Sequence, residues 1–120
     1  MVAAAKASAP KPVFGSARAI DTEHLARMTL GERNLEREVL ALFDRQAEML
    51  LPRIRRGEPA VAAASAHTLK GSAVGIGAFG VARAAEAVEQ AKDAAFAEAI
   101  ETLAAVLEET KAEIARLLAN

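Results

Sequence analysis

The stretch FAEAIETLAAVLEETKAEIARLL, residues 96–118, decides the fold. Six apolar residues and one threonine recur in it at alternating spacings of four and three: Phe96, Ile100, Leu103, Leu107, Thr110, Ile114 and Leu117. This alternation is typical of a helix that lies along the seam of an antiparallel bundle. The sequence therefore predicts a long C-terminal helix in an all-α protein.

Three more long helices are expected before this one. The first follows a capping box, with Thr29 as N-cap and Glu32 reaching back, and ends at Gly57. Its apolar residues form one stripe and a second beside it: Leu35, Val39, Leu42, Phe43, Met49 and Leu50, then Leu40, Ala47 and Leu51. A helix that contacts two neighbours needs such a wide apolar arc.

The connections between the long helices are short, so helices that follow one another in the sequence must be antiparallel neighbours. Pro59 suits the first position of a helix that runs to about Gly75, and another helix covers residues 79–92. Asp21 is the expected N-cap of a short helix that ends near Met28. We predict an up-down-up-down four-helix bundle with a short N-terminal capping helix over residues 20–120, after a flexible tail over residues 1–19.

Composition excludes several classes of function. The 120 residues carry a net charge of −1 with a pI near 6.1, which argues against a nucleic-acid binder. The chain has no cysteine, so disulfides and cysteine-ligated metals are excluded. No apolar run approaches the roughly 20 residues that span a membrane. We expect a cytoplasmic protein, and a monomer because one chain already closes four helices.

His67 lies on the outside of the expected helix over residues 59–75. With Leu69 at the centre of the buried face and about 100° per residue, His67 points roughly 160° away. The helix geometry therefore excludes a core histidine and predicts an exposed one.

An exposed helix face usually carries charged residues and glutamine, but the residues around His67 are small or apolar. Gly71 costs about 1 kcal/mol of helix stability relative to alanine. Since it adds nothing to packing there, its expected role is to let another backbone approach the imidazole. We predict a docking surface for a protein partner made of Ala63, Ala64, Gly71, Val74 and Gly75.

Lys70 follows His67 on the same face, one turn along. Beside a histidine that holds an anion, its charge would offset that of the anion and keep an imidazole lone pair available. Such a ring also needs its other nitrogen held as N–H. The helix over residues 79–92 offers Glu86, Glu89 and Gln90 for this purpose.

The segment HTLKGSA, residues 67–73, with Gly77 and Ala78 behind it, resembles the motif of the histidine-containing phosphotransfer (HPt) domain. The resemblance extends over about residues 21–118. It implies a four-helix bundle with a short N-terminal helix. It also implies that His67 receives a phosphoryl group from an aspartate of one receiver domain and passes it to another.

The resemblance assigns further roles by position. Lys70 would support the phosphoryl group and Gly71 would permit docking. Glu89, which lies 22 residues after His67, would hold the second ring nitrogen. Implied partners are the receiver domains of a hybrid histidine kinase and of a response regulator.

On this interpretation the chain is a phosphoryl carrier of a multi-step phosphorelay and not an enzyme. It has no Gly-rich phosphate loop or nucleotide-binding module with which to use ATP. We expect no cofactor and no metal in this chain, and Mg²⁺ on the receiver partner.

Two other functions stay open. One is a helical interaction adaptor in which His67 is incidental. The other is a detached phosphoacceptor domain of a chemotaxis-type histidine kinase, phosphorylated from ATP by a kinase domain in trans. The chain ends at Asn120 without an extension, which favours a free-standing relay protein.

Overall fold

A computed structural model describes residues 18–119, and all regular structure in this range is helical. The helices are α2 (Thr22–Met28), α3 (Arg33–Arg56), α4 (Pro59–Ile76), α5 (Phe79–Gln90) and α6 (Ala94–Ala119). The prediction of an all-α protein is confirmed. Most of the predicted tail, residues 1–19, lies outside the described range, so the boundary at residue 20 stays a prediction.

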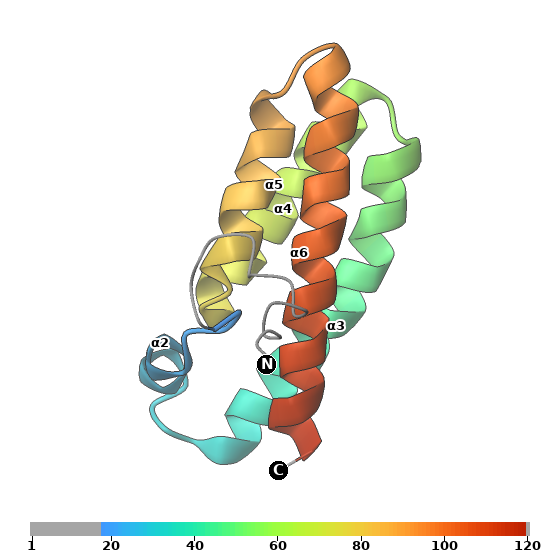
Figure 1. Cartoon of the computed structure of the whole chain (residues 1–120). Coiled ribbons are helices and arrows are strands. Elements are labelled where there is room, and N and C mark those ends of the chain that lie inside the picture. Colours follow the sequence, from blue (N-terminus) through green and yellow to red (C-terminus); the bar gives the residue numbers. More distant parts are fainter. Residues whose placement is uncertain (1–17, 120) are drawn as a thin grey trace, which may run out of the picture.

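The four long helices lie side by side, and α2 lies across one end of them (Figure 1). Helix α4 packs between α3 and α5, and α6 closes the ring because it contacts both α5 and α3. The core at the centre is rich in alanine where α4 meets α5: Ala62, Ala66, Ala73, Ala82, Ala84 and Ala85. Small side chains let two helix backbones approach closely, and among the described helices α4 and α5 share the most extensive contact.

The predicted seam of α6 lies against the core. Ile100, Leu103, Leu107, Thr110 and Ile114 are buried, and Phe96 and Leu117 are partly buried at its ends. The hydroxyl of Thr110 donates to the carbonyl of Val106 at 2.9 Å, which satisfies the one polar group of this seam.

The predicted faces of α3 need a correction. Its buried residues are Leu40, Phe43, Ala47, Leu50 and Ile54, whereas Leu42 and Met49 are 57% and 50% exposed. The apolar arc is wider than the surface that α4 and α6 cover. Its outer edge therefore lies on the surface of the bundle.

The predicted capping box was also wrong. Thr29 ends α2, and its hydroxyl donates to the carbonyl of Leu25 at 2.8 Å. Leu30 and Gly31 have φ of 56° and 72°, so the chain turns through the left-handed region before α3 can begin. Glu32 is the N-cap of α3, and its side chain accepts from the backbone N–H of Leu35 at 2.8 Å.

The short helix α2 begins as predicted. The side chain of Asp21 caps it by accepting from the backbone N–H of His24, and Ile20 and Leu25 are buried on either side of the cap. The backbone N–H of Asp21 donates to the carbonyl of Gly77 at 2.9 Å. These contacts attach α2 beneath the C-terminal end of α4.

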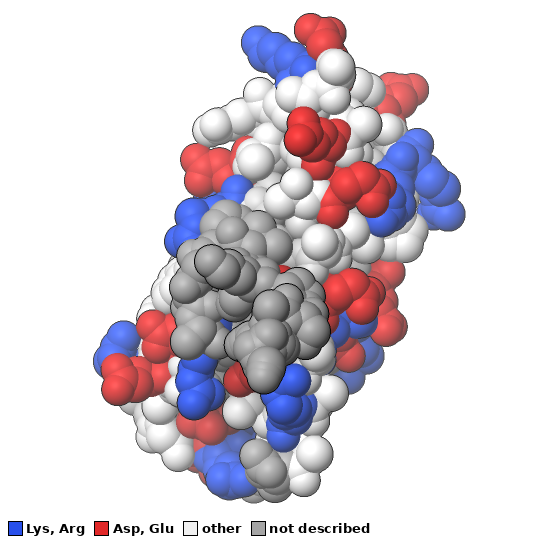
Figure 2. Space-filling view, viewed as in Figure 1, with Lys and Arg blue, Asp and Glu red and all other residues white. Residues whose placement is uncertain are grey.

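Charged residues on the viewed surface are mixed in sign. Figure 2 shows Lys and Arg next to Asp and Glu over the face that α3, α5 and α6 form. An extended basic field of the kind that nucleic-acid binding requires is absent from the uncovered part of this face.

Candidate functional site

His67 lies in the middle of α4, and its side chain is 73% exposed. Its neighbours Ala66 and Leu69 are fully buried and fix the rotation of the helix. The ring therefore stands on the outer surface, as the helix geometry predicted.

Glu89 of α5 contacts the ring of His67. Its Oε2 lies 2.8 Å from Nδ1 of His67, and the Glu89 side chain is 21% exposed. Because an ionised carboxylate only accepts hydrogen bonds, Nδ1 carries the proton in this contact. In the neutral ring the lone pair is then on Nε2.

Lys70 lies beside the same carboxylates but is not closely bonded to them. Its Nζ lies 3.7 Å from Glu86 Oε1 and 3.9 Å from Glu89 Oε1. Both distances exceed those of a hydrogen bond. Lys70 thus lies within ion-pair distance of both carboxylates without a hydrogen bond to either.

Lys111 provides a comparison within the same molecule. Its Nζ donates to Asp44 at 2.9 Å and to Glu48 at 3.1 Å, so it joins α6 to α3. Burial by itself lowers the pKa of Lys111. The hydrogen bonds to Asp44 and Glu48 and the negative charges of these carboxylates outweigh burial, so the pKa lies above its usual value. Lys111 is tied into the fold in a way that Lys70 is not.

The surface around His67 is made of small side chains. Ala64 and Gly71 are exposed, Ala63 and Gly75 are half-buried, and Val74 is 41% exposed. A Cβ at Gly71 or Gly75 would meet no heavy atom of residues 18–119 within 4 Å. The packing of these residues therefore does not require glycine at either position.

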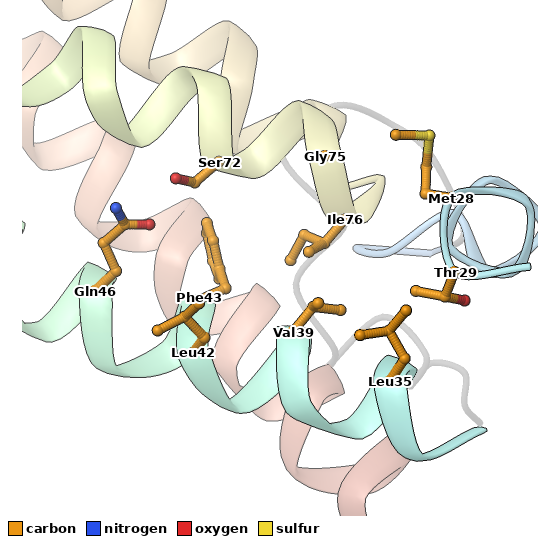
Figure 3. A pocket seen from close by; sticks show the side chains of 10 residues that line it. All are labelled: Met28, Thr29, Leu35, Val39, Leu42, Phe43, Gln46, Ser72, Gly75 and Ile76. Carbon is orange, nitrogen blue, oxygen red and sulfur yellow. The ribbon is translucent and has the colours of Figure 1, made fainter. Parts of the chain in front are cut away.

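An apolar groove beside this surface was missed by the sequence analysis. It has a volume of about 310 Å³ and lies between α2, α3 and α4 (Figure 3). Its lining residues are Met28, Thr29, Leu35, Val39, Leu42, Phe43, Gln46, Ser72, Gly75 and Ile76. The signal in the sequence is the outer edge of the α3 stripe, at Leu35 and Leu42, which helical periodicity alone assigns to the interior.

His24 was missed as well. Its Nε2 lies 3.0 Å from the carbonyl oxygen of Val74, and its ring meets Phe79 edge-on with centroids 5.1 Å apart. A lone histidine in a short polar helix carries no pattern that would have revealed this contact.

The described part of the chain offers neither a cluster of metal-binding side chains nor a membrane-spanning helix. Between residues 18 and 119 no group of three or more His, Cys, Asp or Glu side chains is placed to hold a metal ion. None of the helices in this range is long and apolar enough to cross a membrane.

Comparison with protein families gives the class of protein. The model of the Hpt domain matches residues 34–119, which covers α3 to α6 and includes His67, Lys70 and Glu89. The chain belongs to the Hpt domain family, whose members transfer phosphoryl groups in phosphorelay signalling and interact with receiver domains. Searches of curated proteins and of solved structures found no match.

Proposed function

We propose that this chain carries a phosphoryl group on Nε2 of His67 between two receiver domains. It would accept the group from an aspartate of a hybrid histidine kinase and pass it to a response regulator in the cytoplasm. The observation that carries this proposal is the 2.8 Å contact between Glu89 and Nδ1 of an exposed histidine. With Nδ1 held by Glu89 and the side chain 73% exposed, Nε2 is the nitrogen that is left for a partner.

In the transfer step, the lone pair of Nε2 attacks the phosphorus of the aspartyl phosphate. The N–P bond forms as the P–O bond to the aspartate breaks, and the electron pair leaves with the aspartate carboxylate. The proton stays on Nδ1, so the ring becomes cationic and the Glu89 carboxylate offsets its charge. Phosphoryl transfer of this kind depends mainly on position and charge.

Lys70 would support the transferred phosphoryl oxygens. Its contacts of 3.7 Å and 3.9 Å with Glu86 and Glu89 are loose enough to be exchanged for a dianion nearby. Lys70 also lies one turn from His67 on the same side of α4, so we expect its side chain to reach a phosphoryl group on Nε2.

The partner would dock on Ala63, Ala64, Gly71, Val74 and Gly75, with Mg²⁺ bound by the receiver and no cofactor in this chain.

The contacts of α4 with α3 and α5, and of α6 with both, support the antiparallel four-helix arrangement. A monomer presents this face without hindrance. ATP would enter only through the upstream kinase.

Phosphotransfer profiling tests the proposal. The chain is incubated with each phosphorylated receiver domain of the source organism, and label is followed with time. We expect rapid, acid-labile labelling by a small subset of receivers, mapped to His67 by mass spectrometry. Complexes that form without any transfer of label would instead identify an interaction adaptor.

Glu89→Ala is expected to slow transfer by about 10- to 100-fold, because a hydrogen bond to a charged group contributes roughly 1.5–3 kcal/mol. Glu89→Gln keeps a hydrogen-bond acceptor without the charge, so its transfer rate should lie between those of Glu89→Ala and the wild type. Single-turnover rates measure the effect, and ¹⁵N chemical shifts of the ring report the tautomer. A wild-type rate and tautomer in Glu89→Ala would refute the orienting role.

A further inference from the structure

Two carboxylates share one ammonium beside His67. Oε1 of Glu86 and Oε1 of Glu89 lie 3.7 Å and 3.9 Å from Nζ of Lys70. The other oxygen of Glu89 is engaged by Nδ1 of His67 at 2.8 Å. Orientation of the ring therefore accounts for Glu89 but gives the second carboxylate, Glu86, no part in the proposed transfer step.

Glu86 is held in place from its own helix. Its Oε2 accepts a hydrogen bond from Nε2 of Gln90 at 3.2 Å, one turn further along α5. The Glu86 side chain is 47% exposed and that of Lys70 is 34% exposed, so water and salt screen their attraction only in part. Glu86 thus adds a second, positioned carboxylate at the edge of the site.

Phosphorylation of His67 changes the surroundings of these charges. In the free chain the Lys70 ammonium is attracted by both carboxylates. A phosphoryl group on Nε2 adds up to two negative charges, while Glu89 already offsets the cationic ring that carries it. When Lys70 supports the phosphoryl oxygens, as the proposed function requires, it gives up part of its attraction to Glu86.

The free energies of the two states therefore depend differently on Glu86. Its attraction to Lys70 is larger in the free chain, and its repulsion of the phosphoryl oxygens exists only in the phosphorylated chain. An equilibrium shifts by the difference between the interactions in its two states. Since both effects of Glu86 favour the free chain, its charge lowers the stability of phosphorylated His67.

We propose that Glu86 is a positioning residue that sets the direction of phosphoryl transfer. By competing for Lys70 it favours the passage of the phosphoryl group from His67 to the next receiver. In that step the N–P bond to Nε2 breaks as a bond to the receiver aspartate oxygen forms. The electron pair returns to Nε2, and the ring, which keeps its proton on Nδ1, becomes neutral. This inference rests on the proposed function and adds a determinant of the transfer equilibrium.

The equilibrium constant of transfer tests the inference. The receiver that labels the chain fastest in the profiling is used, and second-order rate constants are measured in both directions, from labelled receiver and from labelled chain. Their ratio compares only the free proteins, phosphorylated and unphosphorylated. A change in docking alone therefore alters both rate constants by the same factor and leaves the ratio unchanged.

Glu86→Gln should shift this equilibrium constant toward phosphorylated His67 by about two- to fivefold, the size expected for a partly exposed ion pair. Glutamine keeps an oxygen that accepts from Gln90, so the variant removes the charge with little change in shape. The shift should become smaller as the salt concentration rises.

Glu108→Gln is the matched control for the loss of one negative charge. Glu108 is exposed on α6, which packs against α3 and α5. Neutralising it should leave the equilibrium constant as in the wild type. A shift equal to that of Glu86→Gln would assign the effect to the net charge of the chain and overturn the inference.

A second background tests the route through Lys70. Lys70→Met removes the ammonium for which Glu86 competes, so adding Glu86→Gln should then shift the equilibrium constant by a smaller factor than in the wild type. The ratio remains the measured quantity even where both rates fall. An equal shift in the two backgrounds would overturn the route through Lys70.

Two further outcomes are decisive. An unchanged equilibrium constant in Glu86→Gln would overturn the inference, and so would a shift away from phosphorylated His67, which would show that Glu86 presents Lys70 to the phosphoryl group. Both results require labelled His67 and leave the proposed function intact. Absence of label on wild-type His67 would instead refute the proposed function.

Discussion

His67→Ala is expected to abolish phosphoryl transfer to this chain, because the alanine methyl group has no lone pair to attack phosphorus. Wild-type protein incubated with a phosphorylated receiver should gain acid-labile label within the time course, and the variant should stay at background. Gel autoradiography measures the label and mass spectrometry maps it.

The variant should remain folded and should still bind. The His67 side chain is 73% exposed, and alanine favours a helix at least as well as histidine. The free energy of unfolding should therefore change by less than about 0.5 kcal/mol. Affinity for the receiver should persist, because the docking surface is intact. The chain has one other histidine, His24; label that persists there or elsewhere in His67→Ala would contradict the assignment.

Gly71→Gln is expected to reduce the transfer rate about 100-fold or more while leaving the protein as stable or more stable. A Cβ at Gly71 meets no heavy atom of the described residues within 4 Å, so these residues leave room for a glutamine side chain. It should gain up to about 1 kcal/mol of helix propensity. The same side chain would hold the receiver away from Nε2, and a displacement of about 1 Å can cost 100-fold in rate.

A size series separates docking from helix stability. Gly71→Ala should raise the unfolding temperature with a smaller loss of transfer than Gly71→Gln. Ala105→Gln is the matched control, since it adds the same side chain at an exposed site on α6, which packs against α3 and α5. Normal transfer by Gly71→Gln would show that the receiver does not approach over this residue.

The residues of the site that lie on α4 follow from sequence spacing alone. His67, Lys70 and Gly71 share one exposed face because any helix places i, i+3 and i+4 together. The buried Ala66 and Leu69 then decide that this face is the outer one. Their chemical roles stay predictions until transfer is measured.

The partner of the imidazole could not be chosen in this way. Glu86, Glu89 and Gln90 were all candidates from the residues, and only the resemblance favoured Glu89. The rotation of α5 against α4 distinguishes them: Glu89 contacts Nδ1 of His67, Glu86 lies nearest Lys70, and Gln90 donates to Glu86 at 3.2 Å. This rotation depends on the alanine packing between two helices.

Local patterns failed where two solutions compete for the same residues. Thr29 and Glu32 fit a capping box, but the left-handed turn at Leu30 and Gly31 assigns them to two different helix ends. Leu42 fits a core stripe, but α3 has more apolar surface than its two neighbours cover.

The sequence by itself determined the all-α class, the order and approximate ends of the helices, and the exposed face that carries His67. These follow from helical periodicity and from residues such as Pro59 and Asp21 that act within a few positions. The tertiary structure alone decided which carboxylate meets the imidazole and how α2 docks through His24. It also decided that α2, α3 and α4 enclose a groove. Each of these depends on contacts between distant segments, which local spacing does not specify.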